Sequence, residues 1–190
     1  FSDQAAKKIA KDLDCAIFTA LTAGVTNSVG STSGDLTDGI VREAIEIVSS
    51  KDVPVDELAF FFNTTTYWHD LMGADKYVQA FVAGWPAGQT PVITGNFGNV
   101  AGKIKGVLYG IPVYVSTQVP KTSSITNFLA HPSAAMYAVR TPGGNMVRSD
   151  AWEEKLKGGT VWRNDIMYGV DGLRGDLACK IVSNVGGIVS

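Results

Sequence analysis

Residues 102–120 read GKIKGVLYGIPVYVSTQVP. Between Gly106 and Thr117, β-branched and aromatic residues predominate, as is typical of a β-strand. Pro112 interrupts this run, and proline cannot donate a backbone hydrogen bond to a neighbouring strand. The stretch therefore predicts an edge strand or a bulged strand. The flanking sequence must supply the elements that pack on it.

The first of these elements is a long helix predicted from Ser2 to Ala23. Ile9, Leu13, Ile17 and Leu21 recur every four residues, which places them on one face of a helix. No charged residue occurs between Asp14 and Asp35. The second half of the helix is thus apolar nearly all round, which predicts that it is buried on more than one side.

A second helix is predicted to begin at Asp35 or Thr37 and to run to about Ser49. The uninterrupted apolar run 58–62 that follows it is typical of a buried strand. The polar residues 63–65 then cap a short helix that continues to Met72.

Downstream of the opening stretch, Pro132 suits the first turn of a helix, and we expect that helix to run to about Arg140. Two further strands are predicted at 160–168 and 177–183. Residues 77–102 contain no charged side chain but many Gly, Pro, Thr and Asn residues, so they predict a long loop or hairpin tip and not a membrane helix. The mixture of helices and strands gives an α+β fold class.

Composition restricts the function further. The chain has 190 residues and a formal charge of −2, from 16 Lys and Arg against 18 Asp and Glu, so no overall basic surface for nucleic acid is expected. Charged residues make up 18%, whereas soluble domains average about 25%. Buried interfaces are poor in charge, so this depletion indicates a surface that other subunits cover. Cys15 and Cys179 both have apolar neighbours, which favours buried free thiols.

No motif predicts catalysis. The glycine-rich residues 95–103 lack two of the fixed positions of a phosphate-binding loop, and Thr32 stands where a nucleophile elbow needs serine. His69, next to Asp70, and the lone His131 form no spacing that suits a metal. We therefore expect no catalytic, cofactor or metal site. A small hydrolase that uses His69 and Asp70 stays open as an alternative of another class.

Several short motifs, taken in order, resemble one protein family. Residues 102–120 are similar to a G-x-I-x-G-x-x-x-G-I-P-V-Y-x-S strand pair that ends in Val-Pro. Upstream, the family has a helix that ends in Val-Pro, then a strand and a short helix, and residues 44–54, 60–62 and 67–72 are similar to these in turn. Downstream, residues 128–134 are similar to its F-x-x-H-x-x-A motif, and residues 167–169 contain its Tyr-Gly pair. The order and the motifs resemble the major capsid proteins of tailed bacteriophages, whose Hong Kong-type fold also forms encapsulin shells.

The resemblance implies a two-part molecule. Residues 1–30 and 142–170 would form a peripheral domain, with the first helix as its spine and 160–168 as its long strand. Residues 31–141 and 171–190 would form an axial domain with a mixed sheet flanked by helices. The family's N-terminal arm and extended loop have no counterpart in this chain, and a start at Phe1 fits a fragment or a processed product.

The implied function is a coat subunit that assembles into the icosahedral shell of a tailed phage around double-stranded DNA, held without sequence specificity. Hexamers and pentamers of the chain itself are the expected partners, together with scaffold, portal or decoration proteins, and no membrane. The expected location is the virion, after assembly in the host cytoplasm. An encapsulin-like shell around a cargo protein is the alternative within this fold. The expected contacts between subunits are Trp85, Phe97, Trp152, Trp162 and Arg163.

Overall fold

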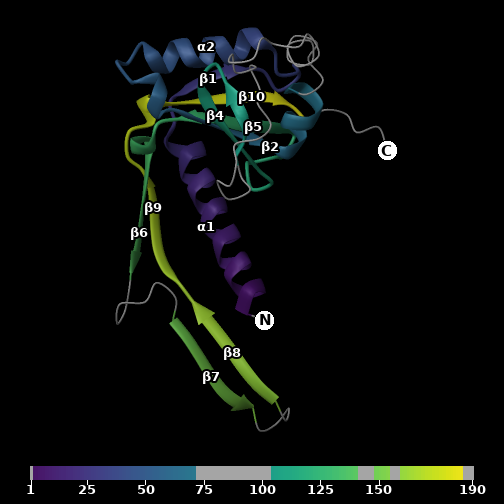
Figure 1. Ribbon diagram of the computed structural model, residues 1–190, viewed down its shortest axis with the longest axis vertical. Helices are drawn as coiled ribbons and strands as arrows, with labels where there is room; N and C mark the ends of the chain where they lie inside the picture. The colour runs from purple at the N-terminus through teal and green to yellow at the C-terminus, as the bar shows by residue number, and fades with distance from the viewer. Residues whose placement is uncertain (1, 72–103, 141–147, 155–158, 186–190) are drawn as a thin grey trace, which may run out of the picture.

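The computed structural model describes residues 2–71, 104–140, 148–154 and 159–185. Figure 1 shows a body built around one sheet, from which a long ribbon of paired strands extends. Helix α1 (Ser2–Gly24) begins beside this ribbon and ends in the body. The α+β class predicted from the sequence is confirmed.

The body contains a six-stranded mixed sheet with the strand order β1-β10-β5-β2-β4-β3. Two neighbouring pairs, β1 with β10 and β2 with β4, are parallel, and the other three pairs are antiparallel. The strands are β1 (Asn27–Gly30), β2 (Ala59–Asn63), β3 (Ile104–Leu108), β4 (Ile111–Ser116), β5 (Ser124–Ala130) and β10 (Ala178–Asn184). The strands predicted at 58–62 and 177–183 are therefore confirmed, whereas β1 and β5 were not foreseen.

Helices cover both faces of this sheet. Helix α2 (Asp38–Ser49) begins after Thr37, whose side chain accepts a hydrogen bond from the Ile40 amide, and it packs on one face. On β2, Phe60 and Phe62 face α2, while Phe61 packs against the α1 side. Because successive strand residues point to opposite faces, a strand covered on both sides must be apolar throughout. This requirement explains the apolar run 58–62.

Helix α1 packs on the other face of the sheet through its C-terminal end. Phe18 and Leu21 are buried there, and the Phe18 ring stacks on Phe128 at a centroid distance of 5.9 Å. Ile9 and Leu13, predicted to face the core, are only half-buried because the first part of α1 extends past the body along the ribbon. The helix bounds were predicted correctly, but the core contacts come from its last two turns.

Residues 104–116 form a hairpin and not one interrupted strand. Tyr109 and Gly110 both adopt positive φ, 54° and 83°, and connect β3 to β4 as a tight turn whose twist suits a hairpin. Pro112 is in β4, between β2 and β3, while β3 forms the edge and carries a register shift between Ile104 and Gly106. Pro112 is tolerated inside the sheet because the pairing of β4 with β2 begins only at Val113.

The polar residues after β2 confirm the predicted cap. The Asn63 side chain accepts a hydrogen bond from the Thr65 amide at 3.0 Å and begins α3 (Thr64–Thr66), which continues as one π-helical turn, η2 (Tyr67–Leu71). A short 3-10 helix, η1 (Val55–Glu57), precedes β2.

The ribbon consists of two antiparallel pairs. Strand β6 (Ala135–Arg140) pairs with β9 (Met167–Gly172), and β7 (Arg148–Glu154) pairs with β8 (Gly159–Asp165). The helix predicted from Pro132 to Arg140 is wrong: a 3-10 helix, η3 (Pro132–Ala134), is followed by β6, because pairing with β9 outweighs local helix propensity. The strand predicted at 160–168 is broken at Ile166 into β8 and β9.

The ribbon joins the body through close backbone contacts. The Ala134 carbonyl accepts a hydrogen bond from the Leu173 amide at 3.0 Å, and the His131 amide donates to the Leu177 carbonyl at 3.1 Å. At the end of α1, a Cβ atom added to Gly175 would lie 1.9 Å from the Gly24 carbonyl oxygen. Only glycine fits there, so the 3-10 helix η5 (Gly175–Leu177) rests directly on the helix end.

His131 lies at this junction and has a structural role there. Its Nδ1 accepts a hydrogen bond from the Ser133 amide at 3.1 Å, which caps η3, and its Nε2 lies 2.6 Å from Glu57 Oε2. A ring whose Nδ1 accepts carries its proton on Nε2, so Nε2 donates to the Glu57 carboxylate. The side chain thereby connects the start of the ribbon to η1 in the body.

Candidate functional site

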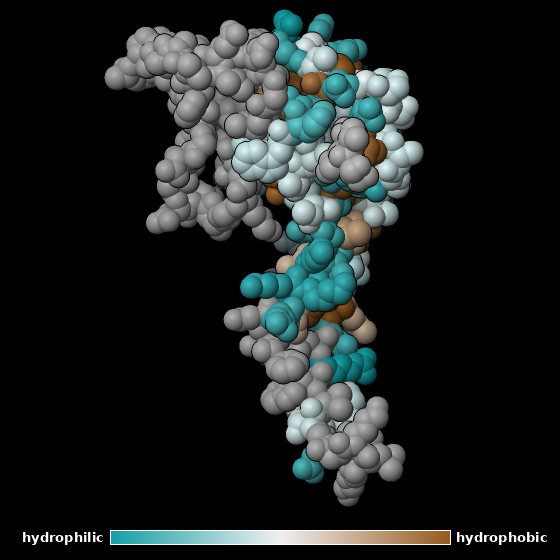
Figure 2. Space-filling view, turned by 90° about the vertical axis from the view of Figure 1, so that its right-hand side faces the viewer, coloured by the Kyte–Doolittle hydropathy of each residue, from teal (hydrophilic) through white to brown (hydrophobic). Residues whose placement is uncertain are grey.

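The ribbon exposes large apolar side chains that have no core of their own to bury them. Met136, Tyr137 and Met167 are 55–59% exposed, Trp152 and Tyr168 are exposed as well, and so is Leu173 directly after β9. Monomeric proteins seldom leave several such residues on one narrow element, and clusters of this kind mark interaction sites. Figure 2 shows hydrophobic and hydrophilic residues intermixed along this part of the molecule.

The register of β6 and β9 sorts these residues onto two faces. Tyr168, Val170 and Gly172 line a groove beside α1, so they point toward the helix. The alternate residues Met167, Gly169 and Asp171 lie on the opposite face of the pair, together with Arg140, Ala138 and Met136 on β6. We call this second set the outer face of the ribbon: it combines the exposed Met136 and Met167 with the charged Arg140 and Asp171 and the small Ala138 and Gly169.

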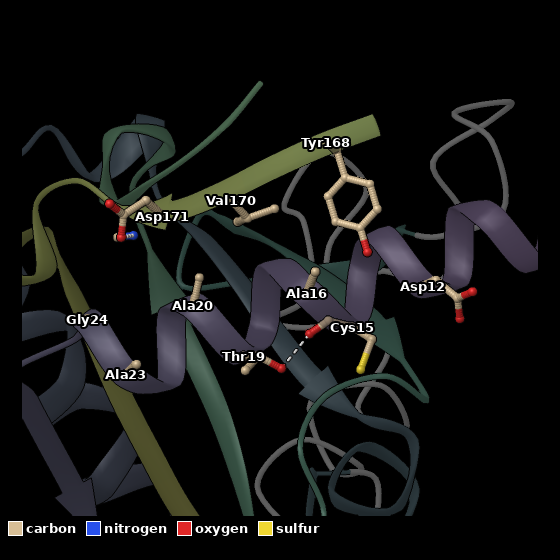
Figure 3. A pocket seen from close by; sticks show the side chains of 11 residues that line it. Asp12, Cys15, Ala16, Thr19, Ala20, Ala23, Gly24, Tyr168, Val170 and Asp171 are labelled. Atoms are coloured by element: carbon tan, nitrogen blue, oxygen red, sulfur yellow. Dashed lines mark hydrogen bonds between the residues drawn. The ribbon is translucent and has the colours of Figure 1, made fainter. Parts of the chain in front are cut away.

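The groove between α1 and β9 has a volume of about 730 Å³. Its helix side is built mainly from small residues, among them Ala16, Ala20, Ala23 and Gly24. Figure 3 shows the Tyr168 ring extending from β9 toward the helix, with Val170 beside it on the same strand. At its closed end, a Cβ atom on Gly172 would lie 3.2 Å from the Gly24 Cα, so the helix and the strand nearly touch.

Cys15 also lines this groove and is exposed, so the prediction that it is buried is wrong. The apolar neighbours that suggested burial belong to other faces of the helix, and the face with Cys15 turns away from the sheet. Cys179 is buried as predicted, and burial raises the pKa of its thiol to about 11.

These two environments predict a large difference in thiol reactivity. The thiolate is the reactive form, and at pH 8 a pKa of about 11 leaves roughly one Cys179 thiol in a thousand ionised. In the native subunit, we expect a maleimide to label Cys15 rapidly and Cys179 only after unfolding. Mass spectrometry of peptides from timed reactions measures this, with Cys15→Ser as the control that leaves one thiol. Rapid labelling of Cys179 in the folded Cys15→Ser variant would contradict the described packing.

Hairpin β7–β8 contains three of the predicted contact residues. Trp152 lies on β7 and is 44% exposed, while Trp162 and Arg163 lie on β8, where they pair in register with Ala151 and Asp150. Arg163 is exposed and forms an ion pair with Asp165 at 2.8 Å. Trp85 and Phe97, with the rest of 77–102, lie outside the described residues. Contacts of all five with other subunits stay predictions.

Sequence reasoning missed Met136, Tyr137 and Met167. The assignment of 132–140 to a helix concealed the first two, although Tyr137 and Val139 are β-formers at the spacing of one strand face. Met167 was placed in a long strand, but nothing in a single sequence showed that this strand would have only one partner.

His69 and Asp70, the residues of the hydrolase alternative, do contact each other. His69 Nδ1 lies 2.8 Å from Asp70 Oδ1, and the buried Asp70 accepts a second hydrogen bond from the Leu36 amide at 3.1 Å through Oδ2. Asp70 therefore fastens the segment before α2 to turn η2. Neither residue lines the α1–β9 groove or the smaller apolar hollow of about 330 Å³ under α1. This geometry gives the alternative no support.

The His69–Asp70 contact makes stability depend on pH. The hydrogen bond and the charge of Asp70 raise the pKa of His69 above its ordinary 6.5. A raised pKa in the folded state stabilises the fold below the unfolded value and stops doing so as the pH rises through the folded value. We therefore expect His69→Gln to destabilise the subunit more at pH 5.5 than at pH 8.5, as measured by urea unfolding.

The size of this effect is limited because the His69 side chain is 51% exposed and its charge is screened. High salt serves as the control, since it should shrink the difference between the two pH values. An equal or larger loss at pH 8.5 would contradict the assigned role of the contact.

Two further properties concern ions and membranes. Within the described part of the chain, no group of three or more His, Cys, Asp or Glu side chains could hold a metal ion. The same residues include no helix with the length and hydrophobicity needed to span a membrane.

Comparison with protein-family models and with curated proteins finds no match. Among solved structures, one from Mycobacterium phage Che8 has a TM-score of 0.70 at 20% identity, covering 95% of this chain and 61% of that one. The capsid of cyanophage P-SCSP1u has a TM-score of 0.64 at 14% identity, covering 96% and 64%. The holo-SrpI encapsulin complex from Synechococcus elongatus has a TM-score of 0.66 at 14% identity, covering 99% and 66%.

The chain thus spans less than two thirds of the length of each of these three proteins. Almost all of it superposes on them despite the low identity, so the order of elements and their arrangement are shared. The chain has the Hong Kong-type capsid fold, which the capsid proteins of tailed bacteriophages share with encapsulin shells.

Proposed function

We propose that the chain is the major capsid subunit of a tailed phage and assembles with copies of itself into an icosahedral shell around double-stranded DNA. One observation carries the proposal: a chain with this fold extends a ribbon whose outer face exposes Met136 and Met167 in the single subunit. Such a face becomes stable when neighbouring subunits cover it. Many weak contacts of this kind add up to a stable shell under closed symmetry.

We expect the subunit to be divided into the same two parts that the family resemblance implies. We propose a peripheral part, 1–30 and 142–170, that supplies the contacts of hairpin β7–β8, and an axial part, 31–141 and 171–190, that meets the symmetry axes of hexamers and pentamers. The presence of α1, β7 and β8 in the first part, and of most of the six-stranded sheet in the second, supports this division. The pair β6–β9 crosses the boundary, with β6 in the second part and most of β9 in the first.

The remaining partners belong to the same proposal. Scaffold, portal or decoration proteins would act during or after assembly in the host cytoplasm, and the mature location would be the virion. DNA would be enclosed without sequence-specific contacts, in keeping with a formal charge of −2.

The contents of purified particles test the function. Particles produced with the full set of neighbouring phage genes should protect double-stranded DNA from nuclease, whereas empty shells made from the chain alone serve as the control. A discrete protein cargo in place of DNA would overturn the genome-enclosing function and favour the encapsulin-like alternative.

A further inference from the structure

Four charged side chains form a square on hairpin β7–β8, at the end that joins β9. Arg148 and Asp150 lie on β7, opposite Asp165 and Arg163 on β8. Residues two apart on a strand share a face, so all four project from the same side of the hairpin. The signs alternate around the square, because each arginine has an aspartate both beside it on its strand and across from it.

The stability of the hairpin does not account for this arrangement. Arg148 Nε lies 2.9 Å from Asp150 Oδ2, and Arg163 Nε lies 2.8 Å from Asp165 Oδ2. The arginine side chains are 67% and 62% exposed, and ion pairs this open to solvent contribute little to folding. A chain with only 18% charged residues has nevertheless gathered four of them at one place.

The same face also presents an aromatic side chain. Trp152 is two residues beyond Asp150 on β7 and therefore shares its face, with 44% of its surface exposed. Tryptophan and arginine are the residues most enriched among those that dominate binding energy in protein interfaces. This composition is typical of a protein contact and unlike that of a merely solvated surface.

We propose that this square binds the same square on a second copy of the chain. If two hairpins meet face to face about a two-fold axis parallel to their strands, Arg148 meets the partner's Asp165 and Asp150 meets the partner's Arg163. A two-fold axis that lies in the interface plane but runs perpendicular to the strands also brings opposite charges together, since Arg148 then meets the partner's Asp150. A square of alternating charge is thus complementary to itself, as an isologous interface requires.

Charge complementarity identifies a second copy as the partner. A patch of one sign would attract any surface of the opposite sign, whereas an alternating patch with no net charge selects a partner with the matching alternation. The planar guanidinium groups of Arg148 and Arg163 can engage a carboxylate in a directional way, which fixes the register between the two hairpins. This inference rests on the proposed function and names the surface through which two subunits would meet.

An exchange of all four charges tests the proposal in the full-length chain. The variant Arg148→Asp, Asp150→Arg, Arg163→Asp, Asp165→Arg keeps the alternation and each pair along its strand, so its thermal unfolding midpoint should match that of the wild type. We expect it to assemble with itself as the wild type does. Mixed with wild-type subunits, it should form at least about tenfold fewer mixed contacts, because like charges then face each other.

Energy transfer between donor-labelled and acceptor-labelled subunits measures mixing, with two wild-type preparations as the control. Free mixing of variant and wild type would overturn the proposal, and so would a folded variant that fails to assemble with itself. Free mixing inside closed shells would leave the proposed function intact. Small oligomers that obey the pairing rule would support this inference and overturn the shell, and a wild-type chain that stays monomeric would overturn both.

Discussion

Replacing Asn127 with leucine is expected to lower the free energy of unfolding by about 2–4 kcal/mol. Asn127 is fully buried in β5, where its Oδ1 accepts the Asn63 amide hydrogen at 2.8 Å. Its Nδ2 lies 3.3–3.4 Å from the Thr66 and Ser183 hydroxyls and the Ile181 carbonyl. Leucine has a similar volume but would leave several buried polar groups without this partner, and each such loss costs about 1–3 kcal/mol.

Urea unfolding followed by circular dichroism measures this loss. The neighbouring strand residue Thr126, which is only half-buried, offers the matched control, and Thr126→Val should change stability by less than about 0.5 kcal/mol. A loss below about 1 kcal/mol for Asn127→Leu would contradict the view that this network holds the end of β2 to β5.

The second large effect is on assembly and comes from the outer face of the ribbon. Replacing both Met136 and Met167 with glutamate is expected to abolish shell formation while the subunit stays folded. Both side chains are more than half exposed in the subunit, so charges there cost little in the isolated chain. Once a neighbouring subunit covers this face, the added carboxylates would have to lose their hydration, which is unfavourable. The carboxylate at 136 would also face the like charge of Asp171, whereas the one at 167 lies across from Arg140.

Sedimentation velocity measures the assembled fraction, and circular dichroism confirms that the double variant is folded. Met136→Leu combined with Met167→Leu is the matched control, since leucine keeps the apolar surface and should assemble as the wild type does. Normal shells from the glutamate variant would show that this face remains open to solvent.

The body of the molecule was predictable where burial left a pattern in the sequence. The run 58–62 is apolar throughout because both sheet faces are covered, and the Thr37 and Asn63 caps were visible as polar residues before helical segments. Strand β5 was not foreseen, because the buried Asn127 and its polar neighbours interrupt the apolar alternation that marks a strand.

The ribbon was harder to predict because its stability depends on pairing between distant segments. Residues 135–140 become a strand only because β9 lies beside them, and the proline that suits a helix start is used for a single 3-10 turn. Trp152, Trp162 and Arg163 were predicted as contact residues, and this stays a prediction; their position on one hairpin follows from the register of β7 and β8. The amino-acid sequence alone does not indicate how β7 and β8 are aligned with each other.

The mass of the native assembly tests the central claim most directly. Light scattering and electron microscopy of the full-length chain, purified without denaturant, should give closed shells in the megadalton range. A monodisperse small oligomer under the same conditions would contradict the capsid function and reduce the likeness to one of fold alone.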